Sequence, residues 1–304
     1  MNSLGFRKGF RIVNGNQTSG AGSGDSIGMS YRIEARDIRS SGWDYTNPNS
    51  FITLSFWVYA SVGQTYYMRL RSMDGTSQHY VMSYTVSANT WTKVIKTIPG
   101  NSNIQFDDDV NQGLQIAWTM FAGTNYTDSG VSLNAWGAYD QSAQYPDITT
   151  TWFTTNDATW NITGLQLELG TQATPFEHRS FGEELQLCKR YYQKSYAYGT
   201  APGTSSSILG CIYNRYSAEV TNRMDLGTRF EVEMRSIPTV IAYSPSTGTA
   251  NRVDDNSNGT GDSAVAVNTV SSLPKISARG IGGVVSSTAF DNVGSYHFTA
   301  EAEI

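Results

Sequence analysis

The chain has 304 residues and a net charge of −5, and 39% of its residues are apolar while only 15% are charged. A soluble domain usually has about 25% charged residues, and here Ser, Thr, Asn, Gly and Tyr take their place, which favours strands and turns over helices. This balance offers no basic surface for nucleic acid. No apolar run approaches the roughly 20 residues that span a bilayer, and we expect neither membrane insertion nor a Sec-type signal.

Strand patterns dominate the first half of the sequence. Short apolar or alternating runs, separated by Gly, Asn, Asp and Ser clusters, are typical of a sandwich or barrel. The run 51–60 (FITLSFWVYA) is the clearest. Alternation places Ile52, Leu54, Phe56 and Val58 on a core face, and Thr53, Ser55, Trp57 and Tyr59 on the other. Further strands are predicted at 64–71, 79–86, 91–98, 114–121, 130–137 and 159–169.

The last of these strands changes parity in its middle. Trp160 and Ile162 share one face, whereas Leu165, Leu167 and Leu169 share the other. An extra residue at a glycine reconciles the two halves, so we predict a β-bulge at Gly164.

Composition divides the chain into two parts. All seven tryptophans lie before residue 161, and the later residues keep the strand rhythm without tryptophan. Since one core usually serves about 100–200 residues, we expect two all-β domains. The boundaries that we predict are 1–172 for an N-terminal β-sandwich, 173–189 for a linker with a short helix, and 190–304 for a smaller β-sandwich domain.

The linker carries many reactive side chains, but its pattern is that of a helix start. Ser180 and Glu183 have the spacing of a capping box, which predicts a helix over 181–188. We expect Phe181, Leu185 and Cys188 to form its buried stripe. A Cys188–His178 nucleophile pair is unfavourable because the cap and the helix separate the two residues. Cys188 and Cys211 are too few for a disulfide framework, so we expect both to be reduced.

The segment from Trp160, WNITGLQLELGTQATPFEHRSFGEELQLCKRYYQKS, resembles a motif of tail-fibre and other virion surface proteins of tailed phages, notably marine cyanophages. The runs NSLGFRKGFRIVNGNQTSGAGSGD, ITLSFWV, NTWTKVIKTIPGNSNIQFDDD, FEVEMRSIPTV and YHFTAEAEI agree with the same family. Members often have a further N-terminal region that attaches to the particle, whereas this sequence starts at Met1.

This resemblance implies a virion surface protein, synthesised in the host cytoplasm and assembled with other virion proteins. Its first module would be a jelly roll similar to carbohydrate-binding modules, its second a small β-domain, and the subunits would form homotrimers. The family motif has no catalytic residues to carry over. The resulting hypothesis is a non-enzymatic tail-fibre subunit that binds a host cell-surface glycan for adsorption. The alternatives are a capsid or tail decoration protein and a tailspike that cleaves glycan.

Sugar recognition uses aromatic faces flanked by amides and hydroxyls. The candidates lie in strand 51–60 and in three polar loops: Trp43, Tyr45, Trp57, Tyr59, Trp136, Tyr139 and Trp152. We assign Trp91, Trp118 and Trp160 to the core instead.

Acidic residues give a weaker pattern for metal binding. Asp107, Asp108 and Asp109 form a cluster of oxygen ligands suited to a structural Ca²⁺, with a solvated acidic turn as the alternative. Asp254, Asp255 and Asp262 form a second and weaker cluster of the same kind. The three histidines are far apart in sequence, so we expect no zinc site.

Overall fold

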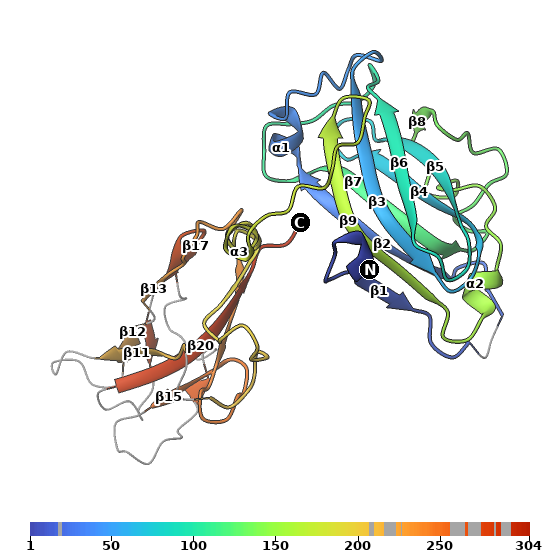
Figure 1. Cartoon of the computed structure of the whole chain (residues 1–304). Helices are drawn as coiled ribbons and strands as arrows, with labels where there is room; N and C mark the ends of the chain where they lie inside the picture. The colour runs from blue at the N-terminus through green and yellow to red at the C-terminus, as the bar shows by residue number, and fades with distance from the viewer. Residues whose placement is uncertain are drawn as a thin grey trace. The chain divides into compact units, whose positions relative to one another are not determined.

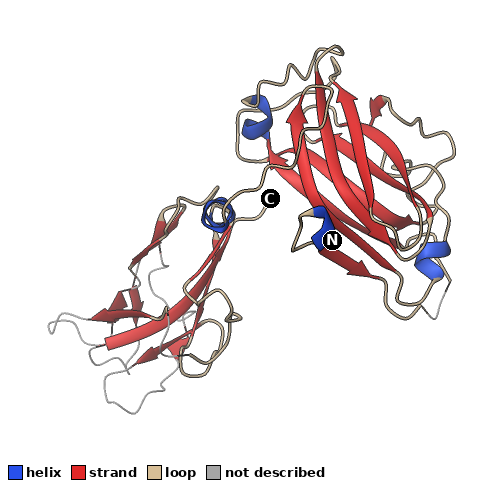
Figure 2. Cartoon of the chain, viewed as in Figure 1, coloured by secondary structure: helices blue, strands red, loops and turns tan. Residues whose placement is uncertain are grey.

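The computed structural model describes residues 1–17, 20–206, 210–215, 223–225, 227–255, 265–266, 275–282, 284–286 and 293–304. Both parts of the chain are all-β with a few short helices (Figure 2). The chain divides into two compact units, Met1–His178 with Ile304, and Arg179–Glu303. The division falls inside the segment 173–189. No helix in the described part of the chain is long and apolar enough to cross a membrane.

The first unit is a sandwich of two antiparallel sheets that lie face to face (Figure 1). The four-stranded sheet contains β1 (Phe10–Val13), β9 (Thr159–Leu169), β3 (Phe51–Ala60) and β6 (Thr92–Pro99), in that order. The five-stranded sheet contains β2 (Ser26–Glu34), β7 (Gln112–Ala122), β4 (Gln64–Ser72), β5 (Gln78–Val86) and β8 (Trp136–Ala138), in that order. Three short helices complete the unit: η1 (Asn2–Leu4), α1 (Ala35–Arg39) and α2 (Thr151–Thr154).

The order of the strands identifies this sandwich as a jelly roll. If the short β8 is set aside, the remaining eight strands can be counted along the chain, so that β9 becomes strand 8. Their order is then 1-8-3-6 in one sheet and 2-7-4-5 in the other. Every pairing within these two sheets is antiparallel. This is the double Greek key of an eight-stranded jelly roll. The all-β, jelly-roll expectation is therefore confirmed.

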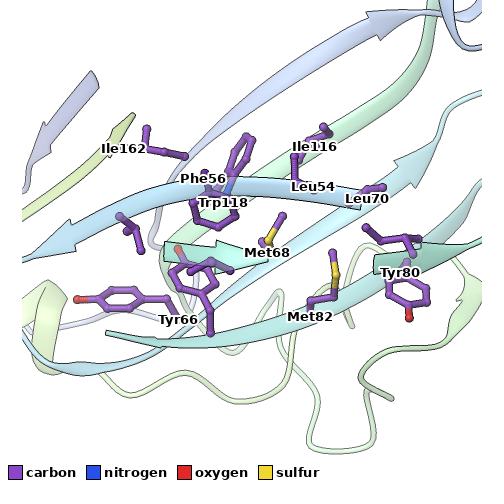
Figure 3. Close-up of a cluster of buried hydrophobic side chains, with 14 of the residues drawn as sticks. Leu54, Phe56, Tyr66, Met68, Leu70, Tyr80, Met82, Ile116, Trp118 and Ile162 are labelled. Carbon is purple, nitrogen blue, oxygen red and sulfur yellow. The ribbon is translucent and has the colours of Figure 1, made fainter. Parts of the chain in front are cut away.

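One apolar core joins the two sheets (Figure 3). Leu54 and Phe56 of β3 are fully buried, and the Phe56 ring meets the rings of Tyr84 and Trp118 edge-on, with centroids 5.6 and 5.8 Å away. The predicted core face of 51–60 is therefore correct. On its other face, Thr53 and Ser55 are buried as well, and Thr53 donates a hydrogen bond to the Gly170 carbonyl in the turn after β9.

Gly164 forms the predicted bulge. Opposite β3, the register of β9 shifts between Ser55 and Trp57, which pair with Gln166 and Thr163. Gly164 has φ +60°, the left-handed region that favours glycine. A side chain there would also overlap the ring of Phe6.

One predicted strand is shorter than expected, and two strands were not predicted. Of the predicted strand 130–137, only β8 forms, since the residues before it lie in a loop in which Asn134 has φ +57°. The strands β1 and β2 were not predicted, although Ile27, Met29, Tyr31 and Ile33 alternate along β2 in the pattern of a half-buried strand.

The second unit contains the helix α3 (Phe181–Lys189) and short strands that pair around β20 (Val293–Glu301). The partners of β20 are β10 (Tyr192–Lys194), β11 (Ile212–Arg215), β14 (Thr239–Tyr243) and β15 (Arg252–Asp255), and β16 (Val265–Ala266) extends β15. The other pairings join β12 (Arg223–Asp225) to β19 (Val284–Ser286), and β13 (Thr228–Arg229) and β17 (Lys275–Ser277) to β18 (Gly280–Gly282). Phe230, Met234, Tyr296 and Phe298 are among its core residues.

The capping box of α3 is confirmed, but the predicted buried stripe is wrong. The Ser180 hydroxyl accepts from the Glu183 amide, and the Glu183 carboxylate accepts from the Ser180 amide. Phe181 is 73% exposed and Cys188 is exposed, whereas Lys189 is buried and pairs with Glu231. The second unit therefore packs on the face that carries Lys189, which helical spacing alone did not indicate.

Candidate functional site

A cavity of about 300 Å³ opens on the outer face of the five-stranded sheet. This outer face consists of the residues that alternate with the core residues; in β4, for example, Met68 and Leu70 face the core and Arg69 and Arg71 face outward. The strands β2, β7 and β4 form one wall of the cavity, and the segment 123–150 forms the other. The lining residues are Ser26, Gly28, Met29, Ser30, Arg69, Gln115, Ala117, Trp118, Thr119, Ala122, Tyr126, Gln144 and Tyr145.

The segment 123–150 is held over the sheet by backbone hydrogen bonds and by a small apolar cluster. The Gln144 amide donates to the Tyr126 carbonyl, and the Asp128 amide donates to the Tyr145 carbonyl. Tyr145 packs against Val81 and Ala122, which are buried outward-facing residues of β5 and β7. The tyrosines of this segment are therefore fixed against the sheet beside the cavity.

Arg69 lies at the centre of this arrangement. It is only 7% exposed, and its Nε donates to the hydroxyl of Tyr145 at 3.1 Å. Its guanidinium carbon lies 5.0 Å from the ring centroid of Tyr139 and 5.6 Å from that of Tyr145. Its buried Nη1 has no hydrogen-bond partner, and no ion pair joins Arg69 to any described carboxylate. A buried donor without a partner is costly, which marks this group as one that a ligand can satisfy.

Gln115 supplies a second unpartnered group. It is 9% exposed, and its buried Oε1 accepts no hydrogen bond. In the sheet register, Gln115 of β7 stands between Arg32 of β2 and Arg71 of β4. The cavity thus contains an unused acceptor as well as an unused donor, which suits a ligand with hydroxyl groups.

Arg71, His79 and Tyr139 extend the polar surface next to the cavity. The Arg71 guanidinium lies 3.5 Å from the Tyr139 centroid, and its Nε donates to the Ser77 hydroxyl. The His79 ring meets Tyr139 edge-on at 5.8 Å. Burial, followed by the charges of Arg69 and Arg71, lowers the pKa of His79. His79 is therefore held towards its neutral form by a surface that is already positive.

Two of the predicted glycan-binding aromatics belong to the core, and the prediction for them is wrong. Trp152 is fully buried, and its Nε1 donates to the Thr159 carbonyl. Trp43 is 3% exposed and packs on Tyr45 and Phe106. Neither indole has a free face on which a sugar ring could stack. Their polar sequence surroundings were misleading because α2 and the loop 40–50 fold these side chains inward.

The other predicted aromatics lie in separate places. Trp57 and Tyr59 are half-buried on the outer side of the four-stranded sheet, where Tyr59 contacts Trp91. Trp91 was assigned to the core together with Trp118 and Trp160, but it is only half-buried. Trp136 packs on Tyr80 and donates to the Pro99 carbonyl at 2.7 Å. Of the predicted aromatics, only Tyr139 lies next to the cavity, where its ring contacts Arg69 and Arg71.

The acidic turn 107–109 satisfies its carboxylates locally. Asp107 accepts from Gln105, Asp108 pairs with Arg36 at 3.6 Å, and Asp109 accepts from the Asn111 amide. Burial, together with Asp107 and Asp109, raises the pKa of the nearby Asp74. The described residues include no group of three or more His, Cys, Asp or Glu side chains arranged for a metal. A calcium ion at this turn stays a prediction.

The second acidic cluster is not assembled in the described part of the chain. Asp254 is buried and accepts hydrogen bonds from Ser244 and Ser246. Asp262 lies outside the described residues.

Arg69, Gln115, Tyr126 and Tyr145 were not among the residues predicted from the sequence. One signal was present: Arg69 and Arg71 alternate with Met68 and Leu70 in a strand that is otherwise apolar and aromatic. Such alternation places two guanidiniums on the face opposite to the core. Nothing in the sequence indicates that a segment more than 50 residues later covers that face.

The cysteines do not add a reactive centre. Both are free, as expected. Although Cys188 is exposed, partial burial of its thiol, with Glu184 next, raises the pKa of that thiol, so the nucleophilic thiolate is disfavoured.

Comparison with protein-family models gives no match, and comparison with curated proteins gives none either. Three solved structures show loose similarity. A family 16 carbohydrate-binding module aligns at 10% identity and a TM-score of 0.26, over 52% of this chain and 74% of its own. The tripod from the baseplate of bacteriophage Tuc2009 aligns at 14% identity and a TM-score of 0.27, over 86% and 80%. Discoidin II from Dictyostelium discoideum aligns at 10% identity and a TM-score of 0.18, over 92% and 94%.

These scores are too low to transfer an activity. The class of protein is therefore defined by the chain's own strand order and cavity: a jelly-roll sandwich with a polar, aromatic-lined cavity on one sheet, joined to a smaller all-β unit.

Proposed function

We propose that this chain is a non-enzymatic subunit of a phage tail fibre or a similar virion surface appendage, and that it binds a host cell-surface glycan in the outer-face cavity. In this proposal the subunits are homotrimeric and attach to other virion proteins. The resemblance of the segment from Trp160 onward to virion surface proteins supports a place in a virion appendage. The cavity supports a glycan as the ligand.

The observation that carries glycan binding is the pair of buried, unpartnered polar atoms in a cavity with aromatic walls. Gln115 Oε1 can accept from a sugar hydroxyl, and Arg69 Nη1 can donate to a sugar oxygen. Tyr126, which is half-buried at the cavity, offers a ring for the apolar face of a sugar. A volume of about 300 Å³ stands at the lower end of the ~300–1,000 Å³ of small-molecule sites, which favours a terminal sugar over a long chain segment.

Binding of the fluorescently labelled chain to host cells tests this function. We expect Gln115→Leu and Tyr126→Ala to weaken binding and to reduce competition with phage adsorption. Tyr213→Ala, at an exposed tyrosine of the second unit, is the control and should bind as the unmodified chain does. Tyr59→Ala tests the four-stranded sheet instead. Loss of binding with Tyr59→Ala but not with the cavity variants would refute the proposed site.

The location in the particle separates receptor binding from decoration. In a reconstruction of the virion, density for the chain at the distal end of an appendage agrees with adsorption, and density over capsomers refutes it. Sedimentation of the purified chain tests the trimer. Reducing ends released from host polysaccharide would contradict the non-enzymatic part of the proposal.

A further inference from the structure

The cavity holds a positive charge that no described group neutralises. Arg69 is 93% shielded from solvent, and its hydrogen bond goes to a neutral tyrosine hydroxyl and not to a carboxylate. A buried ion is costly unless a counter-charge or several hydrogen bonds compensate for the lost hydration. The rings of Tyr139 and Tyr145 supply part of that compensation through their π faces. The Nη1 edge of the guanidinium still lacks a partner.

Neighbouring residues add charge of the same sign. Arg71 and Arg32 stand on either side of Gln115 in the sheet register, and Arg69 is one outward-facing position from Arg71 along β4. The outward positions of β2, β7 and β4 that line the cavity or flank Gln115 carry no Asp or Glu: they are Ser26, Gly28, Ser30, Arg32, Gln115, Ala117, Thr119, Tyr67, Arg69 and Arg71. The next such position along β2 is the buried Glu34, at the end of the strand. The acid that raises the pKa of His79 is Asp140, whose carboxylate is fully exposed and accepts a hydrogen bond from the Ser142 hydroxyl.

Burial lowers the pKa of Arg71; Tyr139 opposes this shift, and the charge of the neighbouring Arg69 adds to it. The same two guanidiniums contribute to the lowered pKa of His79. A positive potential in a partly enclosed, low-dielectric site attracts an anion more strongly than an exposed arginine does.

We propose that the outer-face cavity selects an acidic sugar, whose carboxylate or sulfate group pairs with Arg69. This inference rests on the proposed glycan-binding function and specifies the ligand class for the same site. Guanidinium and carboxylate or sulfate form short charge-assisted hydrogen bonds, which are about twice as strong as neutral ones. Pairing at Nη1 would satisfy the orphan donor and neutralise the buried charge in one contact.

The position of Arg69 is fixed before any ligand binds. Its Nε is held by Tyr145, and Tyr145 is only 5% exposed and packed in the small cluster with Val81 and Ala122. Gly28, which also lines the cavity, adds no side chain to it. A Cβ at this position would lie 2.7 Å from the Trp118 carbonyl oxygen. A preorganised guanidinium loses little conformational freedom on binding, so little of the binding free energy is spent on ordering it.

Titration calorimetry with matched oligosaccharides tests the inference. The probes are oligogalacturonate, the same material after chemical reduction of its carboxyl groups, and sulfated galactan oligosaccharides with their desulfated form. We expect the acidic form of at least one pair to bind and its neutral counterpart to bind about 10- to 100-fold more weakly, the range expected for a hydrogen bond to a charged group. The two pairs distinguish carboxylate from sulfate.

Arg69→Gln is the decisive variant, and Arg11→Gln is its matched control. Arg11 is an exposed arginine on β1 of the other sheet, so the control removes the same charge away from the cavity. We expect Arg69→Gln to lose the preference for the acidic probe and Arg11→Gln to keep it. If Arg69→Gln does not fold, the salt dependence of the unmodified chain replaces it: affinity for the acidic probe should fall as NaCl is raised, and affinity for the neutral probe should not.

The possible failures are distinguishable. Equal binding of acidic and neutral probes, lost in Gln115→Leu, would uphold glycan binding and overturn the acidic preference. Acidic binding that survives in Arg69→Gln, or that Arg11→Gln abolishes, would overturn the role of Arg69. If neither these probes nor host cells bind the chain, the proposed function itself fails.

Discussion

Replacing Gly164 by alanine tests how the bulge in β9 is held. Gly164 has φ +60°, and an added Cβ would overlap the Phe6 ring, with the ring atoms Cε1 and Cε2 3.0 Å away. Phe6 cannot move freely, because it is buried and its ring contacts Phe176 and His178 at centroid distances of 5.1 and 5.6 Å. The substitution therefore combines backbone strain with overpacking.

Gly15 separates these two contributions. It has φ +72°, but a Cβ added there would meet nothing within 4 Å. A left-handed alanine costs about 1–2 kcal/mol, and the loss of glycine flexibility in the unfolded chain returns about 0.4–1 kcal/mol. Gly15→Ala should thus lower the free energy of unfolding by about 1 kcal/mol. Overpacking adds about 1–3 kcal/mol, so Gly164→Ala should cost about 2–4 kcal/mol.

Urea denaturation followed by tryptophan fluorescence measures this difference. All seven tryptophans lie in the first unit, so their emission follows its unfolding alone. In a Phe6→Leu background, the cost of Gly164→Ala should fall towards that of Gly15→Ala, because the smaller side chain relieves the overlap. Equal losses for Gly164→Ala and Gly15→Ala, or an unchanged loss in the Phe6→Leu background, would refute the proposed contact.

Two further predictions concern a buried tryptophan and a buried histidine. Trp152→Ala should lower the free energy of unfolding of the first unit by about 3–5 kcal/mol, because it leaves a large cavity; lost glycan affinity at unchanged stability would contradict the burial seen here. His297 is fully buried, its Nε2 donates to the Ser206 carbonyl, and its Nδ1 accepts from Ser195. Burial lowers the pKa of His297 from 6.5, against the opposing effects of Ser206 and Asp254. The unfolded chain then binds a proton more readily, so the second unit should lose stability as pH falls below about 6.5. Amide exchange of β20 measures this loss, and His297→Gln should flatten it; the same slope in that variant would assign the effect to another group.

The sequence was sufficient where a local pattern decides the structure. Alternation located β3 and its core face, the parity change located the bulge at Gly164, and the Ser180–Glu183 spacing located the start of α3. Each of these features depends on neighbours within a few residues. The local pattern did not show which face of α3 packs, because that depends on residues distant in sequence, as in the pair of Lys189 with Glu231, 42 residues later.

The candidate site could not be predicted because its parts come from distant strands. Trp43 and Trp152 lie in polar stretches, yet tertiary packing buries both in the core. Arg69 and Gln115 lie on neighbouring strands of one sheet, and Tyr145 reaches Arg69 across 76 residues. The sequence by itself determined two all-β parts, their joint and the resemblance to virion surface proteins, since these follow from short-range patterns. Only the tertiary structure decided which aromatics are buried and where a charge lacks its partner, because burial and charge pairing are set by the order of the strands in the sheets.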